Sequence, residues 1–342
     1  MSTPLADSSA SKIRFCSLVS EESGEDPIGS AWSAERYLIT EIPLPWGYEL
    51  LSGKQVPEGL KDFVYGLYAK GIYWGFTAMA PDPAWSVDGH TRILEFVRQT
   101  EEITGYTARE FLIPTDRLIP TLEKYVEDNV APEVTQYQQE RPEGLRDFFV
   151  CTHGAIDACC AKFGFPIYRQ LNTLAKDAAT PTRVWRCSHF GGHRFAATLL
   201  EMPTGRYYGH LKAPHLNGLI THDLEPQDLR RAYRGWAAMP HTLLQVAEGE
   251  AYVRGGWEWT RCAVTHTPAP EAYDEKEGTF TFDYVHPKGE RGSITIQVTP
   301  TITIQTLGSS NSEEVYDAQQ YRCDVLAVSP KGGLLDREPA TV

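Results

Sequence analysis

The sequence of 342 residues contains no run of eighteen apolar residues, so it offers no transmembrane helix. Its first fifteen residues, MSTPLADSSASKIRF, lack the apolar stretch of a secretory signal, and no N-glycosylation sequon occurs. Basic residues are outnumbered: 32 Lys and Arg stand against 45 Asp and Glu, a formal net charge of −13. Nucleic acids and anionic membranes both require a basic footprint. These absences predict a cytoplasmic protein that binds neither nucleic acid nor membrane.

Cysteine is present but in an unsuitable pattern for a disulfide framework. There are seven cysteines, an odd number, and two of them are adjacent at Cys159 and Cys160. The pattern favours a reducing compartment with reactive or metal-bound thiols. The chain also lacks a C-x-x-C motif, a G-x-G-x-x-G fingerprint and a P-loop, which disfavours thiol oxidoreductases and nucleotide-dependent enzymes.

The remaining composition is that of a globular protein, with 42% hydrophobic residues and a length that suggests two or three domains. We predict disorder at 1–12 and an α/β region over 1–140. Its expected strands are 37–42, 74–79 and 93–97, and its expected helices are 59–69 and 115–128. The polar stretch 131–144, which contains two prolines, is the expected domain boundary.

The strand and helix pattern restarts after this boundary, which predicts a second domain over 141–240. Its expected elements are a strand at 146–150, a helix at 160–174, a strand at 183–186, a hairpin formed by 194–200 and 206–211, and a helix at 227–238. The region 241–342 should begin with a helix at 242–253 and continue as a small antiparallel β segment. Its expected strands are 279–286, 293–299, 301–306 and 320–328, several of which alternate in period two.

Potential metal ligands gather in residues 151–193. The stretches CTHGAIDACC (151–160) and WRCSHFGGH (185–193) hold four of the seven cysteines and three of the ten histidines, each at the end of a predicted strand or in the glycine-containing loop beside it. Cys151 and Cys160 can supply two thiolates, and His189 and His193 two imidazoles on either side of a Gly-Gly pair. Zinc accepts such a set as a closed structural site. A [2Fe–2S] cluster accepts it too, as in centres with two histidines on one iron. Spacing alone leaves both metals open.

The motif CTHGAIDACC, together with VWRCSHFGGHRFAATLLEMPTGRYYGHL (184–211), resembles the sucrase/ferredoxin-like family, that is, thioredoxin-like ferredoxins. FCSLVSEESGEDPIGSA (15–31) and YLITEIPLPW (37–46) resemble the start of the same family. The resemblance implies a [2Fe–2S] cluster with Cys151 and Cys160 on one iron and His189 and His193 on the other. It also implies a thioredoxin-like fold around 145–240, and leaves open whether the N-terminal region is a second, cofactor-free unit of this kind.

The expected function is therefore one-electron transfer, coupled to proton uptake at the histidines, with a redox partner protein that the sequence does not identify. An electron carrier fits better than a catalyst, and no sucrase activity is expected, because no carboxylate pair stands out as an acid/base couple. The alternative is a structural Cys₂His₂ zinc protein or partner-binding adaptor without redox activity.

Three residues near the candidate ligands have roles that the sequence does not decide. Cys159 and Cys187 are spare ligands, cluster-transfer thiols or buried core residues, and His153 is a candidate donor to a cluster sulfur. Cys16, like Cys262 and Cys323, stands isolated in the sequence and is expected to be structural.

Overall fold

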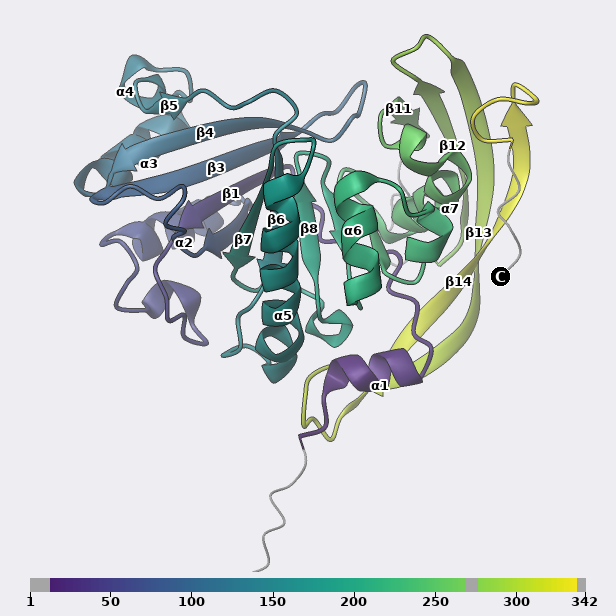
Figure 1. Ribbon diagram of the computed structural model, residues 1–342, viewed down its shortest axis with the longest axis horizontal. Coiled ribbons are helices and arrows are strands. Elements are labelled where there is room, and N and C mark those ends of the chain that lie inside the picture. The colour runs from purple at the N-terminus through teal and green to yellow at the C-terminus, as the bar shows by residue number, and fades with distance from the viewer. Residues whose placement is uncertain (1–12, 268–275, 337–342) are drawn as a thin grey trace, which may run out of the picture.

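The computed structural model describes residues 13–267 and 276–336, so the segment 1–12, predicted to be disordered, lies outside the described residues. The described residues form a mixed sheet of ten strands and an antiparallel sheet of four, with helices packed on both (Figure 1). The predicted α/β class is confirmed. The domain limits at 140 and 240 remain predictions.

The second half of the mixed sheet has the strand order β9-β8-β6-β7. Strands β6 and β7 are parallel, whereas β8 pairs antiparallel with β6 and β9 antiparallel with β8. Helix α5 makes the crossover between the two parallel strands and packs against both. The elements are β6 (Arg146–Cys151), α5 (Ala158–Leu174), β7 (Thr182–Cys187), β8 (Leu199–Met202), β9 (Arg206–Tyr208) and α6 (Ala213–Thr221).

The first half repeats this arrangement with the order β2-β1-β3-β4. Its parallel pair is β1 and β2, and β3 and β4 follow antiparallel, so each half is a parallel pair extended by a hairpin. The elements are β1 (Arg36–Glu41), α2 (Leu60–Ala69), β2 (Gly75–Met79), β3 (His90–Arg98), β4 (Tyr106–Pro114) and α3 (Leu118–Glu127), followed by the short α4 (Pro132–Thr135) and β5 (Gln138–Gln139).

The two halves join edge to edge through β2 and β7, which meet in the single residue pair Met79 and Cys187. A buried ion network adds to this short junction. Arg183 of β7 donates to Glu110 of β4 at 2.9 Å and to Asp147 of β6 at 2.7 Å. Arg141 bridges the same two carboxylates, at 2.9 and 2.7 Å. Although burial alone would raise the pKa of Asp147, the two guanidinium groups hold it below its usual value.

The C-terminal sheet has the order β11-β12-β13-β14 and is antiparallel throughout, as the period-two pattern predicts. Alternate residues of β12 are buried, such as Phe280, Phe282 and Tyr284. Helix α7 packs against β10 of the first sheet and also against three strands of this one. The elements are β10 (Tyr233–Trp236), α7 (Thr242–Trp259), β11 (Ala263–His266), β12 (Gly278–Val285), β13 (Arg291–Leu307) and β14 (Val315–Ser329).

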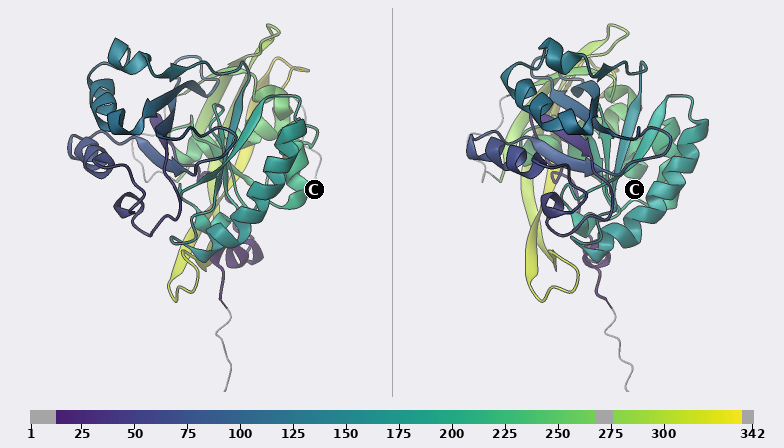
Figure 2. Two further views of the ribbon diagram at one scale, coloured as in Figure 1. Left: turned by 60° about the vertical axis from the view of Figure 1, so that its left-hand side comes forward. Right: turned by 90° about the vertical axis from the view of Figure 1, so that its left-hand side faces the viewer.

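The hairpin β13–β14 is long, and its turn extends to the N-terminal helix α1 (Cys16–Glu22), as Figure 1 shows below the sheets. Figure 2 shows α5 on one side of the mixed sheet and this hairpin on the other. The single strand β13 covers both of the strands predicted at 293–299 and 301–306.

The predicted helix 227–238 is wrong. This segment holds a 3₁₀ turn at Pro226–Leu229 and then strand β10, which pairs with β9. Gly235 takes a φ of +129°, which a helix does not allow, and Tyr233 and Trp236 favour a strand. Helices α1, α4 and α6, strands β4 and β11 and the two-residue β5 were not predicted.

No helix within the described parts of the chain is long and apolar enough to span a bilayer.

Replacing Arg183 with Met should destabilise the protein by about 3–5 kcal/mol, because Asp147 and Glu110 stay buried with one cation fewer. The matched control is Arg261→Met, whose pair with Glu258 is 3.2 Å long and half exposed, so that less than about 1 kcal/mol is expected. Urea unfolding followed by circular dichroism measures both. Equal losses would contradict a supporting role for the network.

Candidate metal centre

The predicted ligands lie where the parallel strands β6 and β7 end. Cys151 is the last residue of β6, and His189 follows β7 by two positions. Cys160 lies in the first turn of α5, whose N-cap Asp157 accepts a hydrogen bond from the Cys159 N–H at 2.8 Å. His193 opens a 3₁₀ turn after Gly191 and Gly192. The carboxyl ends of neighbouring parallel strands meet at one edge, so the topology itself gathers these side chains.

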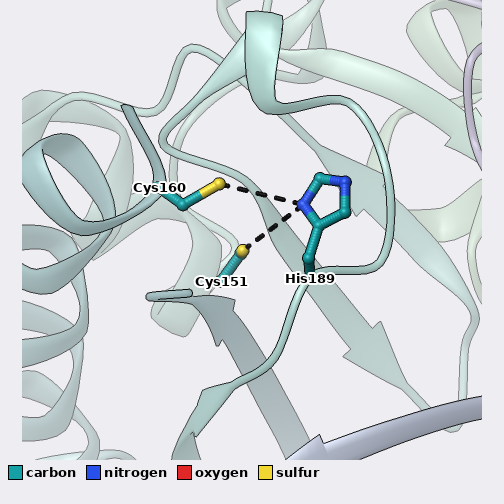
Figure 3. A group of neighbouring side chains, drawn as sticks. All are labelled: Cys151, Cys160 and His189. Atoms are coloured by element: carbon teal, nitrogen blue, oxygen red, sulfur yellow. Dashed lines mark hydrogen bonds between the residues drawn. The ribbon is translucent and has the colours of Figure 1, made fainter. Parts of the chain in front are cut away.

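Three of the four predicted ligands point at one another. The Nδ1 atom of His189 lies 3.9 Å from the Cys151 sulfur and 3.8 Å from the Cys160 sulfur (Figure 3). All three donor atoms lie within 4.8 Å of one another, and both cysteines are buried. The sulfurs come from a strand end and a helix start, and the imidazole comes from the following loop. Two soft donors and one imidazole facing a common point can hold a transition metal.

The two thiols differ in acidity because they share a hydrogen bond. The Cys160 S–H donates to Cys151, and this, together with His189, lowers the pKa of Cys151 well below its usual value despite burial. The same hydrogen bond and, to a smaller extent, burial raise the pKa of the Cys160 thiol. Cys151 is therefore the more acidic thiol of the pair. A thiolate is the form that binds a metal.

The fourth predicted ligand, His193, is held by a distant segment. Its Nε2 lies 2.6 Å from the carbonyl oxygen of Gly308, in the turn between β13 and β14, and its ring centroid lies 5.1 Å from that of His189. A carbonyl accepts, so Nε2 carries the hydrogen and Nδ1 presents a lone pair. That Nδ1 atom is buried and has no hydrogen-bond partner among the described residues. Burial also lowers the pKa of His193, which favours the neutral ring.

The donor set fits a metal group. A ligating histidine needs a neutral ring whose other N–H is held by a carbonyl or carboxylate, which is the arrangement at His193. A buried imidazole nitrogen without a partner is costly unless something binds it. Cys151, Cys160, His189 and His193 are therefore the residues that could hold a metal or a cluster. His193 does not belong to the compact group whose donor atoms all lie within 4.8 Å of one another, so the structure brings three of the four predicted ligands together in that group.

The loop between the two histidines depends on glycine. Gly191 and Gly192 have φ values of +90° and +76°. A Cβ on Gly192 would also collide with the guanidinium of Arg234, which donates to the Gly191 carbonyl at 3.0 Å. His189 and this loop line a cavity of about 720 Å³ that also includes Trp32 and Phe76. One side of the centre is thus open to a small molecule or a partner side chain.

His153 and Cys187 support the site from outside. The Nδ1 of His153 accepts from the backbone N–H of His189 at 3.3 Å, and its Nε2 donates to the Gly47 carbonyl at 2.8 Å. Both ring nitrogens are occupied, so His153 positions the His189 backbone instead of donating to a sulfur. Cys187 is buried at the end of β7, where its carbonyl accepts from the Thr152 N–H, and burial raises the pKa of its thiol. It is a core residue.

Cys159 faces away from Cys160 and belongs to a second cluster, with Cys16 and Asp157. Contacts of its sulfur with Cys16, then with Ser17 and Ser310, lower its pKa to about 6 despite burial. The same contact with Cys159, with burial, raises the pKa of Cys16. The isolated position of Cys16 in the sequence offered no signal for this pairing.

Gly164 allows helix α5 to pack closely against strand β6. A Cβ at this position would overlap the backbone carbonyl oxygen of Cys151, so Gly164→Ala should push the helix and Cys160 away from β6 and cost about 1–3 kcal/mol. Gly66→Ala in α2 is the matched control: nothing lies within 4 Å, and a gain of up to about 1 kcal/mol is expected. Urea unfolding of both variants tests this, and a neutral Gly164→Ala would show that the contact is not tight.

The comparisons with known proteins agree with the motifs. The family model described as sucrase/ferredoxin-like matches residues 27–235, a range that includes all four predicted ligands. No curated protein and no solved structure matches the chain. The match covers more than half of the sequence, and the chain belongs to the sucrase/ferredoxin-like family.

Proposed function

We propose that this chain is an iron–sulfur redox protein that holds a [2Fe–2S] cluster through Cys151, Cys160, His189 and His193 and transfers one electron at a time. When bound, a cluster with two thiolates and two imidazoles takes up an electron at about −150 to +300 mV, against about −400 mV with four thiolates. The residues around it hold the donors in place and limit access. A partner protein would supply or remove the electron.

The observation that carries this proposal is the state of His193. Its Nε2–H is fixed on the Gly308 carbonyl, and its buried Nδ1 has no partner among the described residues. A structural histidine would normally satisfy both nitrogens. The lowered pKa of the Cys151 thiol and the approach of His189 to both sulfurs support the same centre. The family to which the chain belongs carries ferredoxin in its name.

Iron content and visible absorption of protein purified without oxygen test the proposal. We expect about two irons per chain and a coloured protein. His189→Cys and His193→Cys should keep iron but shift the spectrum and lower the potential toward about −400 mV, because a thiolate adds negative charge. His90→Cys, in the first half of the sheet, adds a thiol elsewhere and should leave the spectrum unchanged. A colourless protein without iron would refute the proposal.

The reduction potential should fall as pH rises. Reduction adds negative charge next to the imidazoles and favours the protonated ring, so a proton is taken up with the electron. A fall of up to about 59 mV per pH unit corresponds to one proton per electron. Potentiometric titration from neutral to alkaline pH measures this slope, and His193→Cys should reduce it. A potential that stays constant with pH in the wild type would rule out the coupling.

One observation favours a second candidate, a structural zinc site. A single metal with bonds of about 2.3 Å to sulfur and about 2.0 Å to nitrogen holds its donor atoms about 3.5 Å apart. The two S–N separations here, 3.9 and 3.8 Å, are close to that value. Zinc would then staple β6, α5 and the loop after β7 without redox activity. One equivalent of zinc in place of iron would decide for this candidate.

A further inference from the structure

Two cysteines far apart in the sequence bring their sulfurs into contact beside the candidate centre. Cys16 is the first residue of α1, and Cys159 is the second residue of α5. Their Sγ atoms lie 3.5 Å apart, and both residues are fully buried. The contact joins the N-terminal helix to the helix that carries Cys160.

The two sulfurs are surrounded by hydroxyl groups and apolar side chains. The Ser17 hydroxyl donates to the Cys159 sulfur at 3.2 Å, and the Ser310 hydroxyl lies 3.2 Å from the same sulfur. Around them, Phe15, Val19 and Phe163 pack against the two cysteines. The pair is therefore held together by three separate segments: α1, α5 and the β13–β14 turn.

We propose that Cys16 and Cys159 form a reversible disulfide that fastens α1 to the start of α5. The S–S bond of a disulfide is about 2.05 Å long, so the sulfurs have to approach by about 1.5 Å. Among the described residues, Cys159 supplies the cysteine sulfur that contacts Cys16. In a reducing compartment such a bond forms only transiently, which is the behaviour of redox-responsive cysteines.

A metal ion is the other ligand that this cluster suggests, and Asp157 argues against it. Its Oδ1 accepts from the Cys159 N–H at 2.8 Å and from the Ser310 hydroxyl at 2.6 Å, and its Oδ2 accepts from the Ser310 N–H at 2.8 Å. The carboxylate is thus engaged as the cap of α5 and as the anchor of the turn. Two thiols in contact next to an occupied carboxylate suit a disulfide better.

The oxidant for this step is a small-molecule disulfide. The thiolate of one cysteine attacks a sulfur of that disulfide and releases one small thiolate, which leaves a mixed disulfide on the protein. The thiolate of the second cysteine then attacks the protein sulfur and releases the second small thiolate. Two electrons pass from the two cysteines to the small disulfide, and the two protons end on the released thiols. Excess small thiol reverses both steps.

The bond would also act on the candidate centre, an effect that rests on the proposed function. The turn that contacts Cys159 through Ser310 also holds His193 through the Gly308 carbonyl. Fixing α1 against α5 encloses this turn, so the oxidised protein should release its metal to a chelator more slowly than the reduced protein. Because both sulfurs are buried, α1 has to move aside for the oxidant, and formation should take minutes to hours.

The experiment equilibrates the full chain, as purified with its metal, in mixtures of reduced and oxidised glutathione. Free thiols are trapped with a maleimide, and linked peptides are mapped by mass spectrometry. As the oxidised fraction rises, Cys16 and Cys159 should lose their reactivity together, and a peptide linking them should appear and vanish with dithiothreitol. The melting temperature should rise in the oxidised form, because the bond closes a long loop.

Cys16→Ser and Cys159→Ser should each abolish the linked peptide and the rise in melting temperature, whereas the matched variants Cys262→Ser and Cys323→Ser should keep both. Full alkylation of Cys16 and Cys159 at the most oxidising ratio overturns the proposal. A link from Cys159 to Cys151 or Cys160, or a second metal that Cys16→Ser removes, overturns it too. The mapping on wild-type protein decides even if a variant fails to fold. The result of this mapping does not depend on whether the candidate centre holds iron or zinc, so the disulfide and the proposed function can fail separately.

Discussion

The hydrogen bond between His193 Nε2 and the Gly308 carbonyl is the contact on which the candidate centre depends. It sets the tautomer of the ring, leaves the buried Nδ1 available and draws the β13–β14 turn onto the end of the mixed sheet. Two residues along, Ser310 binds Asp157, the cap of the helix that carries Cys160. The β13–β14 turn therefore orients His193 and stabilises the start of α5. In this way the C-terminal sheet helps to position two of the candidate ligands.

The sequence predicted what local patterns can encode. Strands of period two, the helix predicted at 160–174, and the four donors beside predicted strand ends were all inferred from residues close together in the chain. The partners of those donors could not be read this way. Gly308 lies 115 positions from His193 and Cys16 lies 143 positions from Cys159, and neither separation leaves a local signal. The predicted helix at 227–238 failed for a related reason: β10 exists because β9 offers it a partner, and Gly235 tolerates a φ that helices exclude.

The two halves of the mixed sheet have the same strand order, but only the second half carries the candidate metal ligands. Both halves end a parallel pair of strands at one edge, yet the chain places different residues there. After β1 come Ile42 and Pro43, and after β2 comes Ala80, where the second half has donors around β6 and β7. The topology gathers strand ends in both halves, but only thiols and imidazoles at those ends make a candidate metal centre. The first half supports the site in two other ways. Its edge strand β2 pairs with β7, and the carbonyl oxygen of Gly47 accepts a hydrogen bond from His153.

The limits of the family match divide the centre into two parts. Residues 27–235 include the four donors, but Cys16 and the β13–β14 turn lie outside them. The four donors thus lie in the part of the chain that matches the family model, and the segments that enclose them, α1 and the β13–β14 turn, lie on either side of that part. The first turn of α5 is where the two parts meet, because neighbouring helix residues point about 100° apart. Cys160 faces Cys151 and His189, whereas Cys159 faces α1. Cys159 and Cys160 are consecutive residues in the first turn of α5, so a new bond at either sulfur shifts the backbone of that turn. A disulfide between Cys159 and Cys16 of α1 would therefore change the position of the Cys160 sulfur at the centre.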